Sequence, residues 1–403
     1  MSWELPVNIV LPLFVAVIVL GIFFILKLTK DKTRNISTLR FFIQVIVVPL
    51  MFLGLVVGPF NEPMWQPIGI SPRSSLVGAE FFGTQFPDGL SVPFMACYYS
   101  NGRTVTCGLW QLQAYIFPYW DYSNGYEAIY SIAGIEKVAV VVALLVGASV
   151  IFGRAFCGWV CPFGLYMDVL TRIRKVFRFR RFHISDGSNV KIAQLRYITL
   201  ALALIFSVIL SSYAIFGTEL INGTTPAGPA GQTGFSGAFN EPFCLVCPMR
   251  PLCILIECGL GLMNFDHISI MASESFLGLS SFYISSLNLT ILAIITILAL
   301  MHRRVFCRIC PLGGLTALFS VFKPFKYIAL TKLNKNEQKC TKCGICKRVC
   351  PTQATDVYIK KGGDVTESKC ILCARCVELC PYEDALSLRF AGKSVIKSRN
   401  WLE

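Results

Sequence analysis

The sequence predicts an all-α membrane bundle of about five helices, followed by a small C-terminal α+β domain. Three observations lead to this fold class. Of the 403 residues, 54% are hydrophobic and 15% are charged, and the mean hydropathy is +0.61, a balance that soluble domains do not sustain. Several apolar stretches are long enough to cross a hydrocarbon core about 30 Å thick. The C-terminal part is more polar and carries eight regularly spaced cysteines.

Five apolar stretches are candidate membrane helices. They lie at about 6–28, 41–60, 137–153, 197–217 and 281–301. Basic residues follow the first stretch instead of preceding it, so we interpret it as a helix and not as a cleaved signal peptide. Pro49 predicts a kink in the second helix. This reading gives a membrane domain over residues 1–332 and a tail domain over residues 333–403.

The distribution of charge predicts how the bundle is oriented. Lysine and arginine outnumber aspartate and glutamate by 37 to 23, which gives a formal net charge of +14. The basic residues are concentrated between helices one and two, between three and four, and after helix five. By the positive-inside rule the N-terminus is outside and the tail is cytoplasmic. We therefore expect the positive charge to face membrane lipids and not nucleic acid.

The tail cysteines form two runs, C-T-K-C-G-I-C-K-R-V-C-P and C-I-L-C-A-R-C-V-E-L-C-P. Each is C-x2-C-x2-C-x3-C-P, the pattern that holds 4Fe–4S clusters in two-cluster bacterial ferredoxins, where the fourth cysteine binds the other cluster. Cluster I is therefore expected on Cys340, Cys343, Cys346 and Cys380, and cluster II on Cys370, Cys373, Cys376 and Cys350. Zinc is the alternative, but it would use neither the third cysteine at two-residue spacing nor the repeated Cys-Pro.

The rest of the tail fits a ferredoxin domain of α+β type. We expect short strands, such as one over Val357–Lys360, and a turn at Gly362 and Gly363. A small helix is expected after each cysteine run.

A second cysteine pattern occurs twice at the cytoplasmic ends of predicted helices. R-A-F-C-G-W-V-C-P-F-G ends the third helix with Cys157 and Cys161, and R-V-F-C-R-I-C-P-L-G-G ends the fifth with Cys307 and Cys310. Both open with Arg-x-Phe-Cys and close with Cys-Pro-x-Gly. Two pairs from two helices predict one further cluster, with a closed zinc site or packed structural thiols as alternatives.

A third pattern, F-C-L-V-C-P-M-R-P-L-C-I-L-I-E-C, lies in a loop that the topology places outside. Its cysteines are Cys244, Cys247, Cys253 and Cys258. The repeated Cys-Pro favours a cluster near the outer face, whereas the oxidising compartment makes disulfides the alternative. Cys97 and Cys107 lie in the other outer loop without a neighbouring motif, and we predict a disulfide between them.

Together these motifs resemble the NapH/MauN/NosR/CcoG group of membrane-bound polyferredoxins, which are 4Fe–4S ferredoxin-type integral membrane proteins. The resemblance rests on Cys157, Cys161 and Pro162, on Cys307, Cys310 and Pro311, and on the eight tail cysteines. It covers a little over half of the chain. It implies a multi-pass protein of the prokaryotic cytoplasmic (inner) membrane that serves electron supply or redox maturation. In that group both helix-end motifs are usually C-x3-C-P, whereas the second one here is C-x2-C-P.

Other chemistries have little support in the sequence. There is no Walker motif, no dinucleotide fingerprint after a strand and no evident catalytic nucleophile, and the three histidines do not pair in mid-span as haem ligands would. We expect an electron-transfer subunit of an oxidoreductase system rather than a stand-alone enzyme. It would relay electrons between a cytoplasmic or membrane donor, with quinone as a candidate, and another redox subunit or an outer-face partner. The alternatives are a reductase or maturation factor that supplies a metal ion or an assembling metalloenzyme, and a redox sensor without turnover.

Overall fold

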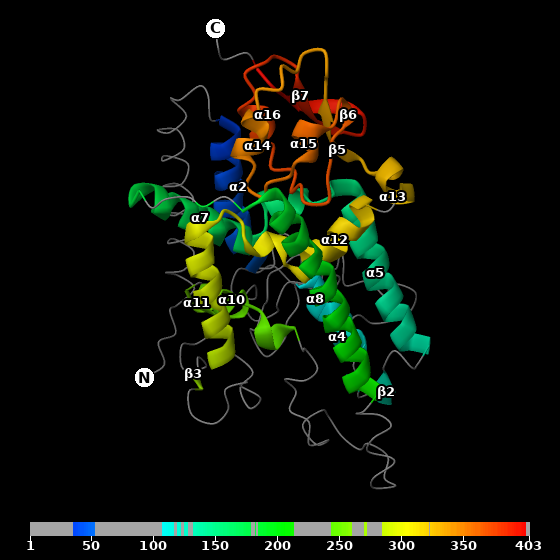
Figure 1. Cartoon of the computed structure of the whole chain (residues 1–403). Coiled ribbons are helices and arrows are strands. Elements are labelled where there is room, and N and C mark those ends of the chain that lie inside the picture. Colours follow the sequence, from blue (N-terminus) through cyan, green and yellow to red (C-terminus); the bar gives the residue numbers. More distant parts are fainter. Residues whose placement is uncertain are drawn as a thin grey trace, which may run out of the picture. The chain divides into compact units, whose positions relative to one another are not determined.

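A computed structural model gives the structure of this chain (Figure 1). The residues it describes are 35–52, 107–116, 119–121, 125–127, 132–178, 182, 184–212, 243–259, 270–271, 284–321 and 323–399.

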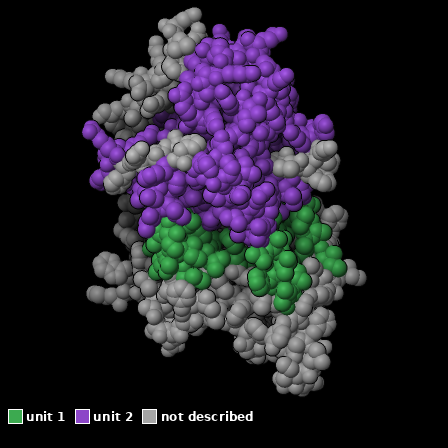
Figure 2. Space-filling view, in the orientation of Figure 1, with its two compact units in different colours: residues 1–10, 49–145, 200–295 green, residues 11–48, 146–199, 296–403 purple. Residues whose placement is uncertain are grey.

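The chain divides into two compact units, which Figure 2 colours separately. Unit 1 comprises Met1–Val10, Pro49–Leu145 and Leu200–Ile295, and unit 2 comprises Leu11–Val48, Val146–Thr199 and Thr296–Glu403. Unit 2 thus contains both helix-end motifs and the whole tail. The predicted domains, residues 1–332 and 333–403, divide the chain differently from these two units. They stay a prediction.

Four long helices lie at or near the predicted membrane stretches. They are α2 (Asn35–Phe52), α5 (Ile132–Phe152), α8 (Asp186–Ser212) and α11 (Ser286–Met301). Among the described residues, one segment, Asp186–Ile209 in α8, is long and apolar enough to cross a bilayer. The apolar parts of the other three helices are shorter. The described residues therefore do not support a five-span bundle, and the stretch predicted at 6–28 lies outside them.

Helix α8 begins earlier than the sequence analysis placed it because its first turn is polar and capped. The Ser185 hydroxyl accepts a 3.2 Å hydrogen bond from the backbone N–H of Ser188, and Asp186 adds a negative charge at the positive end of the helix. The apolar stretch predicted from residue 197 begins about three turns later. The hydropathy pattern marks that stretch and misses the polar start.

Unit 1 is described in shorter pieces. They are α4 (Gly108–Ile116), the antiparallel pair β1 (Tyr119–Asp121) and β2 (Gly125–Glu127), a 3₁₀ turn η5 (Cys244–Val246), α10 (Arg250–Gly259), and the parallel pair β3 (Ile270–Met271) and β4 (Ile284–Ser285). The Gln113 side chain in α4 accepts a 2.9 Å hydrogen bond from the backbone N–H of Phe243, which precedes η5. This bond joins α4 to the third cysteine motif.

Around the helix-end motifs, unit 2 forms a series of short helices. They are α6 (Ala155–Trp159), α7 (Pro162–Val176), η7 (Phe306–Arg308), α12 (Pro311–Val321) and α13 (Lys323–Ile328). Two of them, α7 and α12, begin at the proline of a Cys-Pro pair. Proline is favoured at a first helical position because its fixed φ suits the helix and its missing N–H is not needed there.

The tail is an α+β domain, as the sequence predicts. Its antiparallel sheet has the order β6 (Gly363–Asp364), β5 (Thr331–Lys335), β7 (Leu386–Phe390), β8 (Lys393–Lys397). Side chains along β5 alternate between buried and half-buried. Leu333, Val357, Val365, Val377 and Leu386 belong to the core that lies under the sheet. The sheet and the short tail helices appear together in orange and red in Figure 1.

Two local predictions for the tail were wrong. Residues 357–359, predicted as part of a strand, belong to α15 (Asp356–Ile359). The Glu367 carboxylate accepts hydrogen bonds from the N–H groups of Thr355 and Asp356, and these bonds satisfy the start of that helix. A small helix does follow the first cysteine run, as α15, but the second run is followed by strand β7, and the helices α14 (Ile345–Val349) and α16 (Arg375–Glu378) lie inside the runs. The Gly362–Gly363 turn is present, with Gly363 at φ +78°.

Candidate iron–sulfur sites

The four cysteines predicted for cluster I line one small cavity in the tail. Cys340, Cys343 and Cys346 reach it from the first run and Cys380 from the second. Burial raises the pKa of the Cys346 thiol to about 11, and the nearby Cys340 and Cys343 add to the effect. Positive φ angles at Lys342 and Gly344 bend the run around the cavity. The donor set and the shared cavity fit a cubane cluster.

The thiols predicted for cluster II lie close enough to raise one another's pKa. Burial raises the pKa of Cys370, with further contributions from the charges of Cys350 and Cys373. The pKa of Cys376 is raised well above its usual value by burial, and Cys370, Cys373 and Cys350 contribute. Cys350 comes from the first run and lies with the second. This is the crossover that the spacing predicts.

Backbone N–H groups point at the sulfur atoms of this second set. Ala354 donates to Cys350 Sγ at 3.2 Å and Leu372 donates to Cys370 Sγ at 3.4 Å. Such donors stabilise thiolates and are one of the means by which a protein sets the potential of a cluster. The loop that supplies Leu372 adopts positive φ at Leu372 and Ala374.

The two helix-end motifs have the same local construction. Cys157 lies in α6 and Cys307 in η7, while Cys161 and Cys310 each stand directly before the proline that begins the next helix. The N–H of Gly313 donates to Cys310 Sγ at 3.4 Å, and the N–H of Gly164 does the same for the Cys161 thiol. The Cys-Pro-x-Gly sequence therefore places a sulfur atom at the positive end of a helix with an N–H directed at it.

The difference between C-x3-C-P and C-x2-C-P leaves this construction intact. The Phe156 carbonyl accepts the N–H of Cys161 at 3.0 Å, and the Phe306 carbonyl accepts the N–H of Cys310 at 2.9 Å. Each carbonyl also accepts the N–H of the residue before the second cysteine. The phenylalanine of each motif closes the turn in both cases. The additional residue lengthens the first turn without changing how it ends.

The four helix-end thiols lie close enough to influence one another. Burial raises the pKa of Cys161 to about 12, and Cys157 and Cys307 add to this. The pKa of Cys310 is raised well above its usual value by burial, with Cys157, Cys161 and Cys307 contributing. Such a group of thiols does not ionise together unless a cation offsets the charge. The iron of a cluster would supply that charge.

Among the described residues, no three cysteine, histidine or carboxylate side chains meet closely enough to share a single metal ion. A cubane cluster has a different requirement, because each of its four thiolates binds its own iron.

The first helix-end motif lies directly against the loop that carries cluster II cysteines. Trp159 Nε1 donates a 2.9 Å hydrogen bond to the carbonyl of Leu372. A Cβ on Gly158 would overlap the carbonyl oxygen of Ile371 and come within 3.3 Å of Cys373 Cα. Glycine at this position therefore permits the close approach of the two cysteine-bearing segments.

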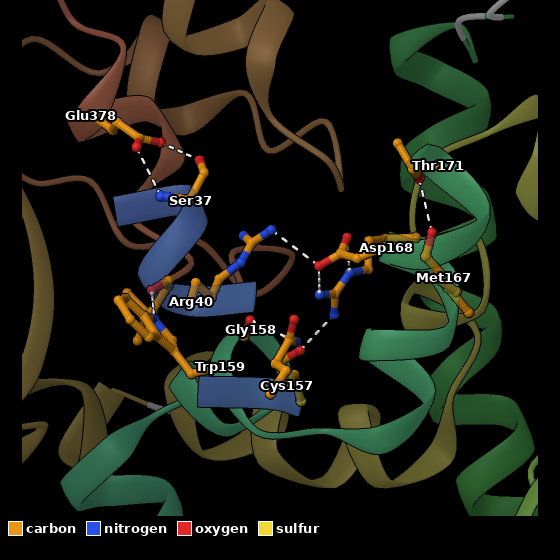
Figure 3. A network of polar contacts seen from close by, with 12 residues as sticks. Ser37, Arg40, Cys157, Gly158, Trp159, Met167, Asp168, Thr171 and Glu378 are labelled. Atoms are coloured by element: carbon orange, nitrogen blue, oxygen red, sulfur yellow. Dashed lines mark hydrogen bonds and ion pairs between the residues drawn. The ribbon is translucent and has the colours of Figure 1, made fainter. Parts of the chain in front are cut away.

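A polar network in unit 2 reaches the helix-end site at Cys157 (Figure 3). Asp168 of α7 accepts from Arg304 Nη2 at 2.5 Å and from Arg40 Nη2 at 3.0 Å. Burial raises the pKa of Asp168, but the two guanidinium groups outweigh this and hold the pKa below its ordinary value. Ser37 at the start of α2 is hydrogen-bonded to Glu378 of α16. No motif or spacing in the sequence points to these residues.

Further polar contacts connect the tail to the start of α8. Asn189 donates to the carbonyls of Thr352 and Gln353 at 3.3 and 3.1 Å. The Gln353 side chain accepts from Arg308 at 2.9 Å and donates to the Ile184 carbonyl at 2.9 Å. Polar residues far apart in sequence make these contacts, and no spacing rule in the sequence indicates them.

The third motif is described in part. Cys244, Cys247 and Cys253 are buried, and the Asn288 amide donates to the carbonyls of Cys244 and Cys247 at 3.2 and 3.3 Å. Cys258 lies in α10, but its side chain is outside the described part. A cluster at this site stays a prediction.

The predicted Cys97–Cys107 disulfide is described at one end only. Cys107 is buried directly before α4. Cys97 lies outside the described residues, so the disulfide also stays a prediction.

Comparison with known families gives two matches. A model described as a 4Fe-4S binding domain matches residues 138–180, which include Cys157 and Cys161. A model described as a 4Fe-4S dicluster domain matches residues 307–383, which include the second helix-end pair and all eight tail cysteines. Both kinds of cysteine site thus fall within 4Fe–4S families.

Among curated proteins, the chain is similar to the uncharacterized protein MJ0750 of Methanocaldococcus jannaschii. The two are 29% identical over 222 residues, which is 54% of this chain and 66% of that protein. No solved structure matches. The two family matches show that this chain is an iron–sulfur protein with ferredoxin-type domains that bind 4Fe–4S clusters.

Proposed function

We propose that this chain is a membrane-bound electron-transfer protein of an oxidoreductase system, in which the two tail clusters exchange electrons with a third cluster at the helix ends. The observation that carries the proposal is the contact of Gly158 with Ile371 and Cys373. Cys157 is bonded directly to Gly158, so a single through-space step joins the ligands of the two sites.

Short steps matter because electron tunnelling weakens steeply with distance. A path from Cys373 across to Gly158 and along the backbone to Cys157 stays within packed protein. The Trp159–Leu372 hydrogen bond holds the two segments in register beside it. The chain's contribution is thus to fix the spacing of the sites and to set the polarity around them.

The membrane location is supported by the apolar surface of the long helices. In α8 the side chains of Leu202, Ile205, Phe206 and Ile209 are exposed, in the segment that is long enough to span a bilayer. Exposed apolar side chains in such number suit contact with lipid. We propose a multi-pass protein of the prokaryotic cytoplasmic membrane, with the N-terminus outside and the tail in the cytoplasm as the charge distribution indicates.

Helix α7 fits a position along the inner surface of that membrane. It exposes Val169, Ile173 and Val176 and carries Arg172 and Lys175 among them. An exposed apolar strip flanked by basic residues is typical of helices that lie on anionic lipid.

For the outer face of the membrane, we propose that the third motif holds a fourth cluster and passes electrons to an outer-face partner or another redox subunit. A quinone is the candidate membrane carrier. The support is the burial of Cys244, Cys247 and Cys253 together with the Cys-Pro pattern that this motif shares with the cluster-binding ones.

The decisive experiment is the content of iron and acid-labile sulfide in anaerobically purified full-length protein. Roughly sixteen of each per chain would support four cubanes, and about twelve would support the tail pair and one embedded site. Cys161→Ser should then remove about four irons and leave the tail signals unchanged. About eight irons in the unaltered protein, with no loss in Cys161→Ser, would reject the relay and leave a protein with the tail clusters alone.

A further inference from the structure

The two helix-end motifs exchange their arginines. Arg154 opens the first motif, and its Nη2 donates to the carbonyl of Cys307 in the second motif at 3.1 Å. Arg304 opens the second motif, and its Nη1 donates to the carbonyl of Cys157 in the first motif at 2.7 Å. Each arginine thus binds the first cysteine of the other motif. We call this pair of contacts the arginine exchange.

The glycines of the two motifs complete the exchange. A Cβ on Gly313 would lie 2.9 Å from Arg154 Nη2, and a Cβ on Gly164 would overlap Arg304 Nη1. The glycine that closes each Cys-Pro-x-Gly therefore makes room for the arginine that opens the other motif. The exchange accounts for the arginine and the glycine that both motifs share.

The two arginines make equivalent contacts with the opposite motif, but they differ in their ion pairing. Arg304 is 1% exposed and is paired with Asp168. Arg154 is 2% exposed, and its second hydrogen bond, 2.7 Å from Nη1, goes to the carbonyl of Ser368. Within the described part of the chain, Arg154 forms no ion pair with a carboxylate. Arg304 is therefore ion-paired with a carboxylate. Asp364 and Glu367 line the same cavity as Arg154 without an ion pair to it, and Glu367 is paired with Lys369.

Arg154 also lies between the two cysteine sites. Ser368 stands two residues before Cys370 of cluster II, and Arg196, which is also buried, donates to the same carbonyl at 3.0 Å. On the other side, Arg154 interacts electrostatically with Cys307. A positive charge in this position acts on whatever negative charge the helix-end thiolates carry.

A buried charge without a partner costs several kcal/mol, so a buried guanidinium without a carboxylate indicates another anion nearby. Four thiolates around a cubane carry net negative charge, and reduction adds one electron to it. Net charge is one of the factors that set cluster potentials. A neighbouring cation therefore stabilises the reduced state more than the oxidised one.

We propose that Arg154 raises the reduction potential of the helix-end cluster, and that Asp168 offsets the same effect of Arg304. This inference rests on the helix-end cluster of the proposed function. Arg154 acts as a positioning and charge-setting residue and is not a ligand. Because Arg154 is not ion-paired with a carboxylate, the helix-end cluster is easier to reduce than it would be if both arginines were paired.

The test is a redox titration of the full-length protein, followed by electron paramagnetic resonance, in Arg154→Gln and Asp168→Asn. Arg154→Gln should lower the midpoint potential of the helix-end cluster by an amount equal to at least a tenfold change in its reduction equilibrium, about 59 mV for one electron. Asp168→Asn should raise it, because Arg304 is then unbalanced. Arg154→Lys should stay close to the unaltered protein. The potentials of the tail clusters are the internal reference.

Opposite shifts are the result that a merely structural role would not give. If the helix-end signal is present but moves in the same direction in both variants, or does not move in Arg154→Gln, the inference is wrong and the cluster assignment stands. If the unaltered protein gives tail signals alone, both the cluster assignment and the inference fail. If Arg154→Gln loses the signal, the sign of the shift in Asp168→Asn decides, since a lowered or unchanged potential there contradicts the inference.

Discussion

Trp159 and Leu372 are joined by a 2.9 Å hydrogen bond between the indole N–H and a backbone carbonyl, although 213 positions separate them in the chain. The indole ring also packs against the hydrophobic core of the tail. Trp159 comes two residues after the first cysteine of a helix-end motif, and Leu372 lies between two cysteines of cluster II. The bond therefore joins two cysteine sites that the sequence presents as separate.

Trp159→Phe should weaken this junction without removing its apolar packing. The carbonyl of Leu372 would lose its donor, and we expect a loss of about 1–2 kcal/mol in the free energy of unfolding. Denaturant unfolding followed by cluster absorbance measures it. Tyr327→Phe, at an exposed ring, is the control and should change nothing. Equal stability of both variants would show that the bond contributes little.

Gly158→Ala should separate the two sites. A methyl group there overlaps the carbonyl oxygen of Ile371, so the segments must move apart, and electron transfer between the tail and the helix-end cluster should slow by tenfold or more. Rapid-mixing kinetics with a reductant of the tail clusters measures this rate. Gly187→Ala is the matched control, because a Cβ there meets nothing within 4 Å. An unchanged rate in Gly158→Ala would place the transfer path elsewhere.

Asp168→Asn should destabilise unit 2. The substitution leaves Arg304 and Arg40 without their shared carboxylate, and a buried charge that loses its partner costs about 3–5 kcal/mol. Thermal unfolding of the intact protein checks this. Asp384→Asn is the comparison, because its bonds to Lys339 and Lys397 are on the surface and its removal should have little effect. Similar melting temperatures for the two variants would contradict a structural role for the Asp168 network.

Replacing single tail cysteines should show which run supplies the fourth ligand of each tail cluster. Cys350→Ser should remove the signal of cluster II, although Cys350 belongs to the first run, and Cys380→Ser should remove that of cluster I. Each variant should lose about four irons. Loss of cluster I in Cys350→Ser would show that each run holds its own cluster.

The tail is the part of the fold that the sequence predicts best, because ligand spacing constrains the backbone around a cubane. The grouping of the cysteines into two sets follows from that constraint, whereas the turn at Gly363, with its positive φ, follows from the Gly-Gly pair. Residues 357–359 show its limit. The apolar, β-branched pattern there suggests a strand, but the Glu367 carboxylate from the next loop along the chain accepts hydrogen bonds from the N–H groups of Thr355 and Asp356 and favours a helix. Such a partner cannot be identified from local sequence.

The helix-end site shows a different limit. The repeat of Arg-x-Phe-Cys and Cys-Pro-x-Gly is visible in the sequence, and the resemblance of the two segments predicts that their cysteines belong together. That Arg154 binds Cys307 and Arg304 binds Cys157 depends on how the segments pack. Asp168 likewise looks like any polar residue of a surface helix until Arg40 and Arg304 are placed beside it.

The exchange of arginines has a consequence for how the protein is made. During synthesis the first motif leaves the ribosome long before the second, and at that stage it lacks the arginine that binds the Cys157 carbonyl. The complete set of contacts around the four helix-end thiols therefore exists only after the second motif has been synthesised and has packed against the first.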